Sequence, residues 1–181
     1  MKLKTLRNMF VGKILSKSRL IKRLETNHRK GVELYADGRY RESEKQFSRN
    51  LELVKSIGPE SDELLSYLKA LGDFYHDTGN YSSAETPFME LLRISRKNIR
   101  KNPDQVLSAL NDIALLLYAQ GRYKEAEDYF RQLLEILEKQ HPTSRRMATC
   151  LENYAAVLRR INLDKESQLL RERAKKIRDS L

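Results

Sequence analysis

The stretch GRYKEAEDYF, from Gly121 to Phe130, occurs in two further versions in this chain. GRYRESEKQF begins at Gly38, and GNYSSAETPF begins at Gly79. The intervals between the glycines are 41 and 42 residues, and a further step of 41 residues reaches Asn162. Asparagine is the other residue that tolerates a left-handed backbone. A fixed period of this length predicts an array of stacked helix pairs.

Apolar residues within each predicted unit recur at helical spacing. In LLSYLKALGDFYHDTG, the residues Leu64, Leu68, Leu71 and Tyr75 follow one another at intervals of three and four. Gly72 lies on the same stripe, inside the predicted helix, where glycine costs about 1 kcal/mol relative to alanine. We therefore expect a neighbouring helix to approach closely at this position. The equivalent positions of the other units hold Gly31, Ala114 and Ala155.

The second predicted helix of each unit carries a small residue and, one turn later, an aromatic residue. These pairs are Ser43 with Phe47, Ala84 with Phe88, and Ala126 with Phe130. In the fourth unit, Ser167 and Arg171 occupy the two places. A terminal repeat has no following neighbour and must present a polar outer face. Four basic residues would supply that face: Arg171, Arg173, Lys175 and Lys176.

The composition is typical of a globular helical protein, with 40% hydrophobic and 33% charged residues. The single cysteine, Cys150, cannot form an internal disulfide, and three histidines do not provide zinc-ligand spacing. We expect Cys150 to be a small buried residue. The sequence thus predicts no metal, no cofactor and a reducing compartment such as the cytoplasm.

The formal net charge of +10 is concentrated at the start of the chain, because residues 1–24 contain eight basic residues and no acid. Apolar residues in this basic arm fall on one helical stripe. Three explanations compete: a helix that caps the first repeat, a helix that lies on an anionic membrane surface, and an arm that contacts nucleic acid or docks a protein. Peripheral membrane association and organelle targeting stay open as well. The basic residues are Lys2, Lys4, Arg7, Lys13, Lys17, Arg19, Lys22 and Arg23.

The repeated units resemble the tetratricopeptide repeat. LKALGDFY, with Ala84 and Phe88, follows that family's pattern of a large residue, Leu-Gly, Tyr and then Ala-x3-Phe. The lengthened unit with GRYKEAE and the HP linker is similar to the repeats of kinesin light chains and related bacterial proteins. The resemblance implies an all-α, right-handed solenoid over residues 25–181, after the arm of residues 1–24. Its repeats would span residues 25–58, 61–101 and 104–140, with a degenerate capping pair at residues 144–179.

The resemblance also implies a concave groove lined by the first helices, which binds a protein or peptide partner without catalysis. Asn111 is the one groove position that matches the asparagine row of kinesin light chains. We interpret His76, Asp77 and Asp73 as ordinary solvated surface and expect no enzyme. The predicted function is an adaptor, scaffold or assembly factor within a larger complex; the alternative is a protein recruited to membrane or nucleic acid through its arm. The implied groove residues are His28, Tyr35, Lys69, Asp73, His76, Asn111, Leu115, Tyr118, Glu152 and Arg159.

Overall fold

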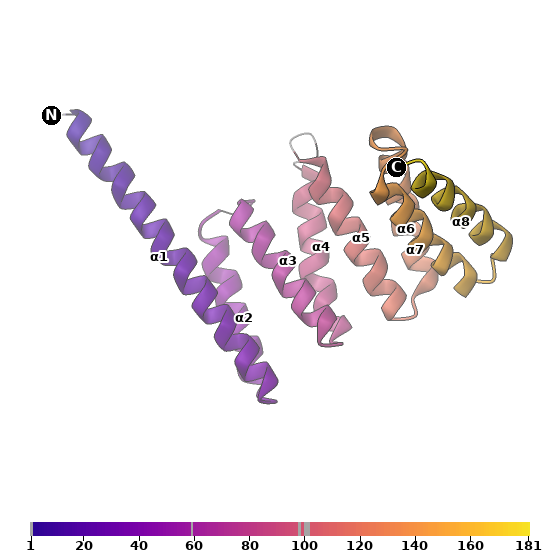
Figure 1. The fold of residues 1–181 in the computed structure, drawn as a ribbon. Helices are drawn as coiled ribbons and strands as arrows, with labels where there is room; N and C mark the ends of the chain where they lie inside the picture. Colours follow the sequence, from indigo (N-terminus) through magenta and orange to yellow (C-terminus); the bar gives the residue numbers. More distant parts are fainter. Residues whose placement is uncertain (1, 59, 98, 100–101) are drawn as a thin grey trace. The chain divides into compact units, whose positions relative to one another are not determined.

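The computed structural model describes the backbone of residues 2–58, 60–97, 99 and 102–181, and the side chains from Ser18 onward in these ranges. The described residues form eight α-helices and no β-strand (Figure 1), which confirms the predicted all-α repeat fold. The helices are α1 (Lys2–Ala36), α2 (Tyr40–Lys55), α3 (Asp62–Asp77), α4 (Tyr81–Lys97), α5 (Pro103–Ala119), α6 (Tyr123–Gln140), α7 (Arg145–Arg160) and α8 (Asp164–Asp179). The chain divides into two compact units, Met1–Tyr67 and Leu68–Leu181, whose boundary falls within α3.

The recurring turn residues adopt the left-handed conformation that the sequence predicts. Gly121 has φ of 76°. Its N–H donates to the Tyr118 carbonyl at 3.0 Å, and the N–H of Arg122 donates to the Leu117 carbonyl at 2.9 Å. These two bonds close the end of α5 in the manner of a Schellman motif. Asn162 repeats the conformation with φ of 64°, so the fourth turn is built like the glycine turns.

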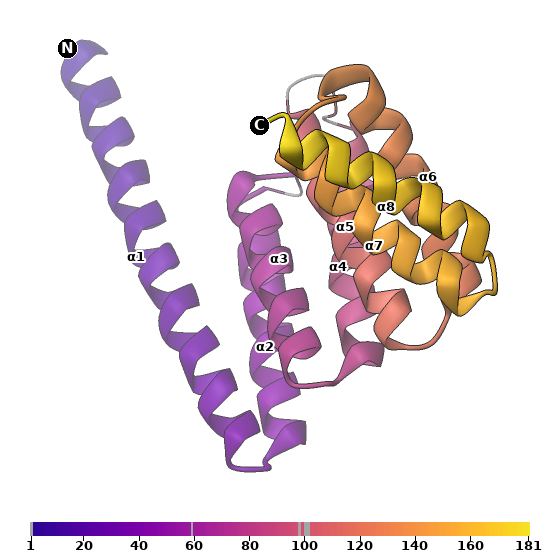
Figure 2. The same cartoon turned by 45° about the vertical axis from the view of Figure 1, so that its right-hand side comes forward.

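In the first unit, α1 and α2 form an antiparallel pair joined by the Gly38 turn (Figure 2). Gly31 permits this contact, because a Cβ atom at that position would overlap the ring of Phe47. The hydroxyl of Ser43 donates to the Gly31 carbonyl at 2.7 Å. Nearer the middle of α1, the buried amide of Asn50 donates to the carbonyl of Leu24 at 2.8 Å. Leu24 is buried, and α1 runs without a break across it.

In the second unit, small residues again mark the close approaches. A Cβ atom at Gly72 would overlap the ring of Phe88, which confirms the expected contact at that glycine. Three alanines that the sequence places at equivalent contacts are fully buried: Ala84, Ala114 and Ala126. The ring of Phe130 stacks on that of Tyr154 at a centroid distance of 6.0 Å, which joins α6 to α7. Phe130 is therefore covered by α7, the first helix of the next pair.

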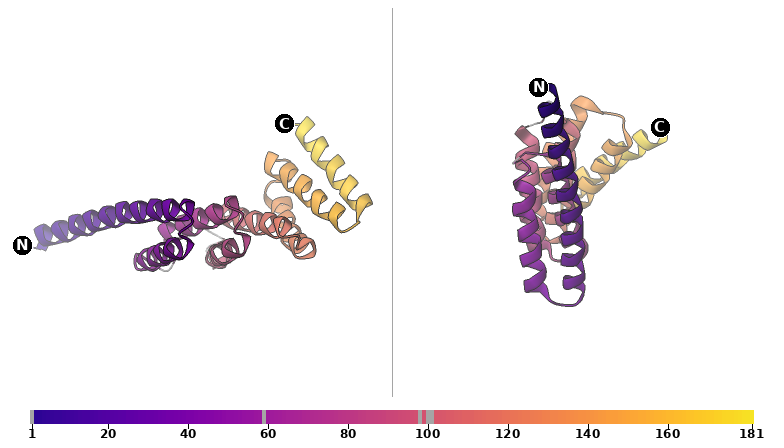
Figure 3. Two further views of the ribbon diagram at one scale, coloured as in Figure 1. Left: turned by 90° about the horizontal axis from the view of Figure 1, so that it is seen from below. Right: turned by 90° about the vertical axis from the view of Figure 1, so that its left-hand side faces the viewer.

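The helices α7 and α8 pack against each other as the last pair of the chain (Figure 3), and their role as a capping pair stays a prediction. Ser167 donates to the Ala155 carbonyl at 2.7 Å, in the same way as Ser43 bonds Gly31. Arg171, which stands where the other pairs have phenylalanine, is exposed. Arg173 is partly exposed, and its guanidinium lies 2.7 Å from the carboxylate of Glu138 of α6.

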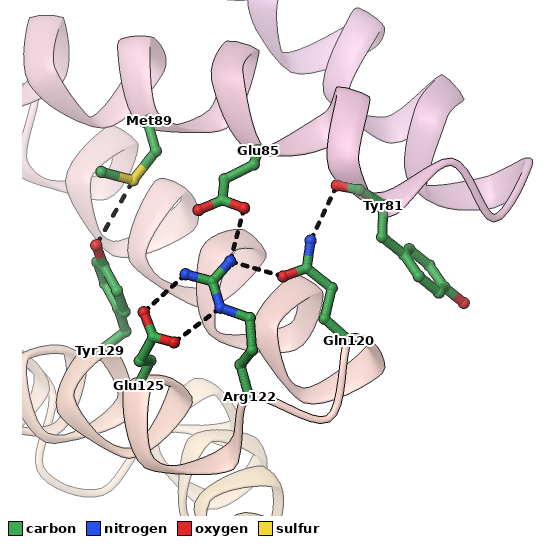
Figure 4. Close-up of polar contacts among 7 residues, drawn as sticks. All are labelled: Tyr81, Glu85, Met89, Gln120, Arg122, Glu125 and Tyr129. Atoms are coloured by element: carbon green, nitrogen blue, oxygen red, sulfur yellow. Dashed lines mark hydrogen bonds and ion pairs between the residues drawn. The ribbon is translucent and has the colours of Figure 1, made fainter.

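Polar contacts join the second helices α4 and α6 (Figure 4). Arg122, which directly precedes α6, donates to Glu85 of α4 at 2.7 Å and to Glu125 of α6 at 2.7 and 2.8 Å. The amide of Gln120 donates to the Tyr81 carbonyl at 3.1 Å. One arginine thus connects two consecutive second helices through two carboxylates, and both carboxylates raise its pKa.

Candidate functional site

Two rows of partly or fully exposed residues lie on the first helices α5 and α7. They recur at spacings of three and four, so each row occupies one face of its helix. Other residues of α5, among them Leu110, Ile113 and Leu117, are buried. We call the two rows together the α5–α7 face: Ser108, Asn111, Leu115 and Tyr118 of α5, and Arg145, Thr149, Glu152, Ala156 and Arg159 of α7.

A cavity of about 260 Å³ opens on the α5–α7 face. Its floor includes Leu133 of α6 and Cys150 of α7, which are each 2% exposed. Burial raises the pKa of Cys150 to about 12, so this thiol stays protonated at neutral pH and behaves as a small apolar residue. The lining residues are Ser108, Asn111, Leu133, Arg145, Arg146, Thr149 and Cys150.

Lys69, a predicted groove residue, is already held by two carboxylates. Its ammonium donates to Asp73 of α3 and lies 3.2 Å from Asp112 of α5. It also lies 5.7 Å from the centroid of the Phe88 ring. Burial raises the pKa of the Asp112 carboxyl, although Lys69 opposes that shift. Burial likewise opposes the charge of Lys69, but its two carboxylate partners outweigh this effect and raise its pKa. The cluster carries one positive and two negative formal charges.

Two further ion pairs involve or contact cavity-lining residues: Arg146 is a member of one, and Arg178 of the other donates to the Thr149 hydroxyl at 3.3 Å. Arg146 donates to the Asp104 carboxylate at 2.6 Å, which connects α7 to the start of α5. Arg178 of α8 donates two hydrogen bonds of 2.7 and 2.6 Å to the carboxylate of Glu152, and these bonds lower the pKa of the glutamate. Glu152, another predicted groove residue, is thus neutralised within the chain.

Arg145 and Arg159 differ from these residues. Both are exposed on α7, and neither forms an ion pair or hydrogen bond with any residue that the structure describes. Arg159 was expected at the groove, whereas the pattern of groove positions missed Arg145. A signal was present in the sequence. The position 17 residues before the turn residue holds an acid in two units, Asp62 and Asp104, but holds the basic Arg145 in the last unit.

Aromatic pairs recur where the first helix of each pair ends. The ring of Tyr118 meets that of Tyr123 at a centroid distance of 5.4 Å, and Tyr35 meets Tyr40 at 4.9 Å. His76 packs in the same way against Tyr81 at 5.6 Å. Each of these three predicted groove residues is therefore held in place by the tyrosine of the following turn, with part of its surface left exposed.

His28, the groove residue predicted for α1, packs among aromatic rings of the first unit. Its ring centroid lies 5.4 Å from that of Phe47 and 5.8 Å from that of Tyr67. Burial lowers the pKa of His28 below the ordinary value of 6.5. The hydroxyl of Tyr67 donates to the Phe47 carbonyl at 3.3 Å, and burial raises the pKa of Tyr67 to about 12. The structure thus places the half-buried ring of His28 against Phe47 and Tyr67, and its part in a groove stays a prediction.

Most of the predicted basic arm lies outside the described side chains. This applies to Lys2, Lys4, Arg7, Lys13 and Lys17. The remaining three basic residues, Arg19, Lys22 and Arg23, are exposed on α1. A role of the arm in recruitment stays a prediction. In the described part of the chain, no helix has the length and apolar character required to cross a bilayer. The same residues contain no group of three or more His, Cys, Asp or Glu placed to hold a metal ion.

The fold is similar to that of several solved structures. BtubC (BKLC) from P. vanneervenii has a TM-score of 0.68 at 19% identity over 82% of this chain, which spans 61% of the BtubC chain. The nearly identical TPR-like repeats of a kinesin light chain candidate from Podosopora anserina have a TM-score of 0.71 at 19% identity, covering 87% of this chain and 76% of that one. MamA of AMB-1 has a TM-score of 0.52 at 15% identity, covering 88% and 93%. At these identities the likeness concerns the fold.

No curated protein matches the sequence of this chain significantly. The family model described as tetratricopeptide repeat matches residues 23–97 and 105–180, which is most of the chain. Repeat arrays of this kind generally serve as scaffolds for protein–protein interaction through extended surfaces. The four left-handed turns, the small residues beneath Phe47 and Phe88, and this match agree with one another. The chain belongs to the tetratricopeptide repeat family.

Proposed function

We propose that the α5–α7 face docks a segment of a partner protein, so that the chain works as an adaptor, scaffold or assembly factor. The cavity of about 260 Å³ on this face is the observation that carries the proposal. The side-chain amide of Asn111 and the hydroxyls of Ser108 and Thr149 can exchange hydrogen bonds with the backbone of an extended peptide. Leu115, which is partly exposed one turn after Asn111, offers apolar contact beside them.

Binding rather than chemistry fits the side chains of this face. Catalysis by Cys150 would require a thiolate, and burial keeps this thiol protonated. The arginines and hydroxyls around it can orient a ligand by hydrogen bonding. Specificity would then come from a few polar contacts at the cavity and from apolar contact along α5.

A peptide selection followed by site-specific crosslinking tests the proposal. Phage displaying random peptides are panned on the full chain, and an enriched peptide is synthesised. A photoreactive benzoylphenylalanine is placed at Thr149 in one variant and at Leu169 in another. Leu169 is a suitable control position, because it is 65% exposed on α8 and does not line the cavity. We expect the peptide to crosslink at Thr149 and not at Leu169. Failure to enrich any peptide, or equal crosslinking at both positions, would contradict the proposal.

A substitution on the same face provides a second measurement. Leu115→Asp places a charge in the expected apolar contact, and we expect it to weaken peptide binding by about tenfold, which corresponds to about 1.4 kcal/mol. Leu115 is partly exposed, so the fold should tolerate the change. Leu169→Asp is the matched control and should leave the affinity unchanged. The alternative result, equal affinity for both variants, would remove α5 from the docking surface.

A further inference from the structure

We propose that the docked segment is acidic, with one carboxylate side chain entering the cavity beside Arg145 and a second one pairing with Arg159. The inference rests on the proposed docking at the α5–α7 face. It names the chemistry of the partner: aspartate or glutamate side chains at two defined positions of an extended segment. The unpaired charges on the face, the polar lining of the cavity and the spacing of the two arginines support this inference.

The first observation is a count of charges in the second unit. Four acidic residues on or next to the α5–α7 face each have a cationic partner within the chain. Asp73 and Asp112 share Lys69, Asp104 is bonded by Arg146, and Glu152 is gripped by Arg178. Arg145 and Arg159 are left without a partner among the described residues. Because Asp73 and Asp112 share one lysine, these four acids face only three cations, and Arg145 and Arg159 bring the sum of the nine formal charges to +1. The two arginines are the charges still open to a ligand, which favours an acidic partner.

The second observation is the chemistry of the cavity. Asn111 contributes amide donors, and Thr149, whose oxygen accepts from Arg178 at 3.3 Å, keeps its O–H as a donor, so a carboxylate beside Arg145 would find several donors in one place. The hydroxyl of Ser108 already bonds the Asp112 carboxylate. Arg146 keeps guanidinium N–H groups beyond those that bond Asp104. The volume of about 260 Å³ is below the range of about 300–1,000 Å³ that is usual for small-molecule pockets. A single side chain of a larger partner is the occupant that such a volume suits.

The position of Arg145 supports a role in binding rather than in folding. It stands in the first turn of α7, which contains no acidic residue. A cation there opposes the helix dipole, whereas an acid would be favourable. The first turns of α3 and α5 contain Asp62 and Asp104, which follow that rule. A departure from a local stability rule is expected at functional positions.

The third observation fixes the spacing. Arg145 and Arg159 are 14 residues apart, which is close to four helical turns, so both lie on the same side of α7. At about 1.5 Å per residue, their Cα atoms are about 21 Å apart. An extended segment rises about 3.4 Å per residue. A segment that runs along α7 would therefore bring two acidic residues to the two arginines when they are about six positions apart.

The experiment uses the same random-peptide phage library, panned on the full chain and on three variants. Arg145→Glu and Arg159→Glu each reverse one of the unpaired charges. Arg171→Glu is the matched control, because Arg171 is an exposed arginine of α8 and its reversal changes the net charge by the same amount. Circular dichroism and melting temperature verify that each variant is folded. The affinity of one synthesised peptide is then measured for all four proteins by fluorescence anisotropy.

We expect peptides enriched on the full chain to carry two Asp or Glu residues about six positions apart. Arg145→Glu and Arg159→Glu should each weaken binding by about tenfold to a hundredfold, because each removes a charge-assisted contact. Arg171→Glu should leave the affinity within about twofold. A peptide with Lys in place of the acid that faces Arg145 should regain affinity for the Arg145→Glu variant.

Two kinds of failure are distinguishable. Enriched peptides that crosslink at Thr149 but lack the pair of acids, or that bind Arg145→Glu and Arg159→Glu unchanged, would overturn this inference and leave the proposed docking face intact. A selection without enrichment, or crosslinking at Leu169 as strong as at Thr149, would overturn both. In a further peptide, phosphoserine takes the place of the acidic residue. If this peptide binds more than about tenfold tighter than the acidic one, the ligand group is a phosphate, which contradicts the carboxylate partner named here.

Discussion

The ammonium of Lys69 lies 3.2 Å from the carboxylate of Asp112, a residue 43 positions further along the chain. The same ammonium also bonds Asp73. Lys69 therefore fills an electrostatic role within the second unit, and its charge is not available to a ligand in the way that the charge of Arg145 is. This difference separates residues that hold the first helices α3 and α5 together from residues that face a partner.

Replacing Lys69 should destabilise the fold in a pH-dependent manner. In Lys69→Met, the Asp112 side chain, which is only 15% exposed, loses its cation. We expect a loss of about 1–2 kcal/mol at neutral pH, a value kept low because Lys69 itself is 37% exposed. Burial raises the pKa of Asp112 above the ordinary value of 3.8, and the loss of Lys69 should raise it further.

The sign of the pH effect follows from that shift. An acid whose folded pKa exceeds its unfolded pKa binds more protons when folded, so acidification stabilises the folded state through this group. The stability deficit of Lys69→Met relative to the wild type should therefore shrink as the pH falls toward about 4. Melting temperatures measured across this range provide the readout. Lys124→Met, at an exposed position of α6, is the control, and an equal deficit at all pH values would contradict the role of Asp112.

Gly72→Ala should destabilise the chain although alanine is the better helix former. The propensity gain is about 1 kcal/mol. The added Cβ atom, however, would overlap the buried ring of Phe88, and overpacking of this kind costs about 1–3 kcal/mol. We expect a net drop in the midpoint of urea unfolding. Ser66→Ala, at an exposed position of the same helix, should leave the midpoint unchanged or raise it slightly. A more stable Gly72→Ala variant would show that the two helices can move apart at no cost.

His28 should make the first unit less stable in mild acid. Its folded pKa is lowered by burial, so the unfolded chain binds the proton more readily. The contribution of this residue to stability is then present above the unfolded value of 6.5 and declines as the pH falls below it. Melting temperatures at about pH 7.5 and pH 5.5 should differ less in His28→Leu than in the wild type. His141→Leu, at an exposed position, should retain the wild-type difference.

Arg145→Glu should stabilise the free protein while it weakens peptide binding. An acid in the first turn of α7 interacts favourably with the helix dipole, by about 0.3–1 kcal/mol. Thermal unfolding of the ligand-free variant measures this gain. Arg171→Glu, in the middle of α8, should show no comparable increase. A clear loss of stability in Arg145→Glu would indicate that the arginine has a structural partner.

The basic arm can be shortened at two places with different results. Deletion of residues 2–24 removes Leu24, which is buried and whose carbonyl accepts a hydrogen bond from Asn50. We expect this deletion to lower the melting temperature more than deletion of residues 2–17 does, because loss of a buried leucine side chain alone costs about 2–5 kcal/mol. Equal melting temperatures for the two truncated chains would place the start of the folded unit after Leu24.

The sequence by itself determined the repeat, its turns and its close contacts. Gly121 and Asn162 mark left-handed turns because few other residues tolerate that backbone, and Gly72 marks a close approach because it has no side chain. These are local constraints, and a period of 41 or 42 residues repeats them. Their positions could therefore be predicted without coordinates.

Only the tertiary structure decided which charges of the face remain available. The sequence predicts a groove position for Lys69, Glu152 and Arg159 alike. In the structure, Asp112 of α5 pairs with Lys69, and Arg178 of α8 pairs with Glu152. Such pairs form between residues that are distant in sequence, and they depend on how the helices stack side by side. Periodicity places a side chain on a face of its helix, but the neighbouring helix determines whether its charge is cancelled. The charge of Arg145 has no such neighbour among the described residues, and only the tertiary structure shows this.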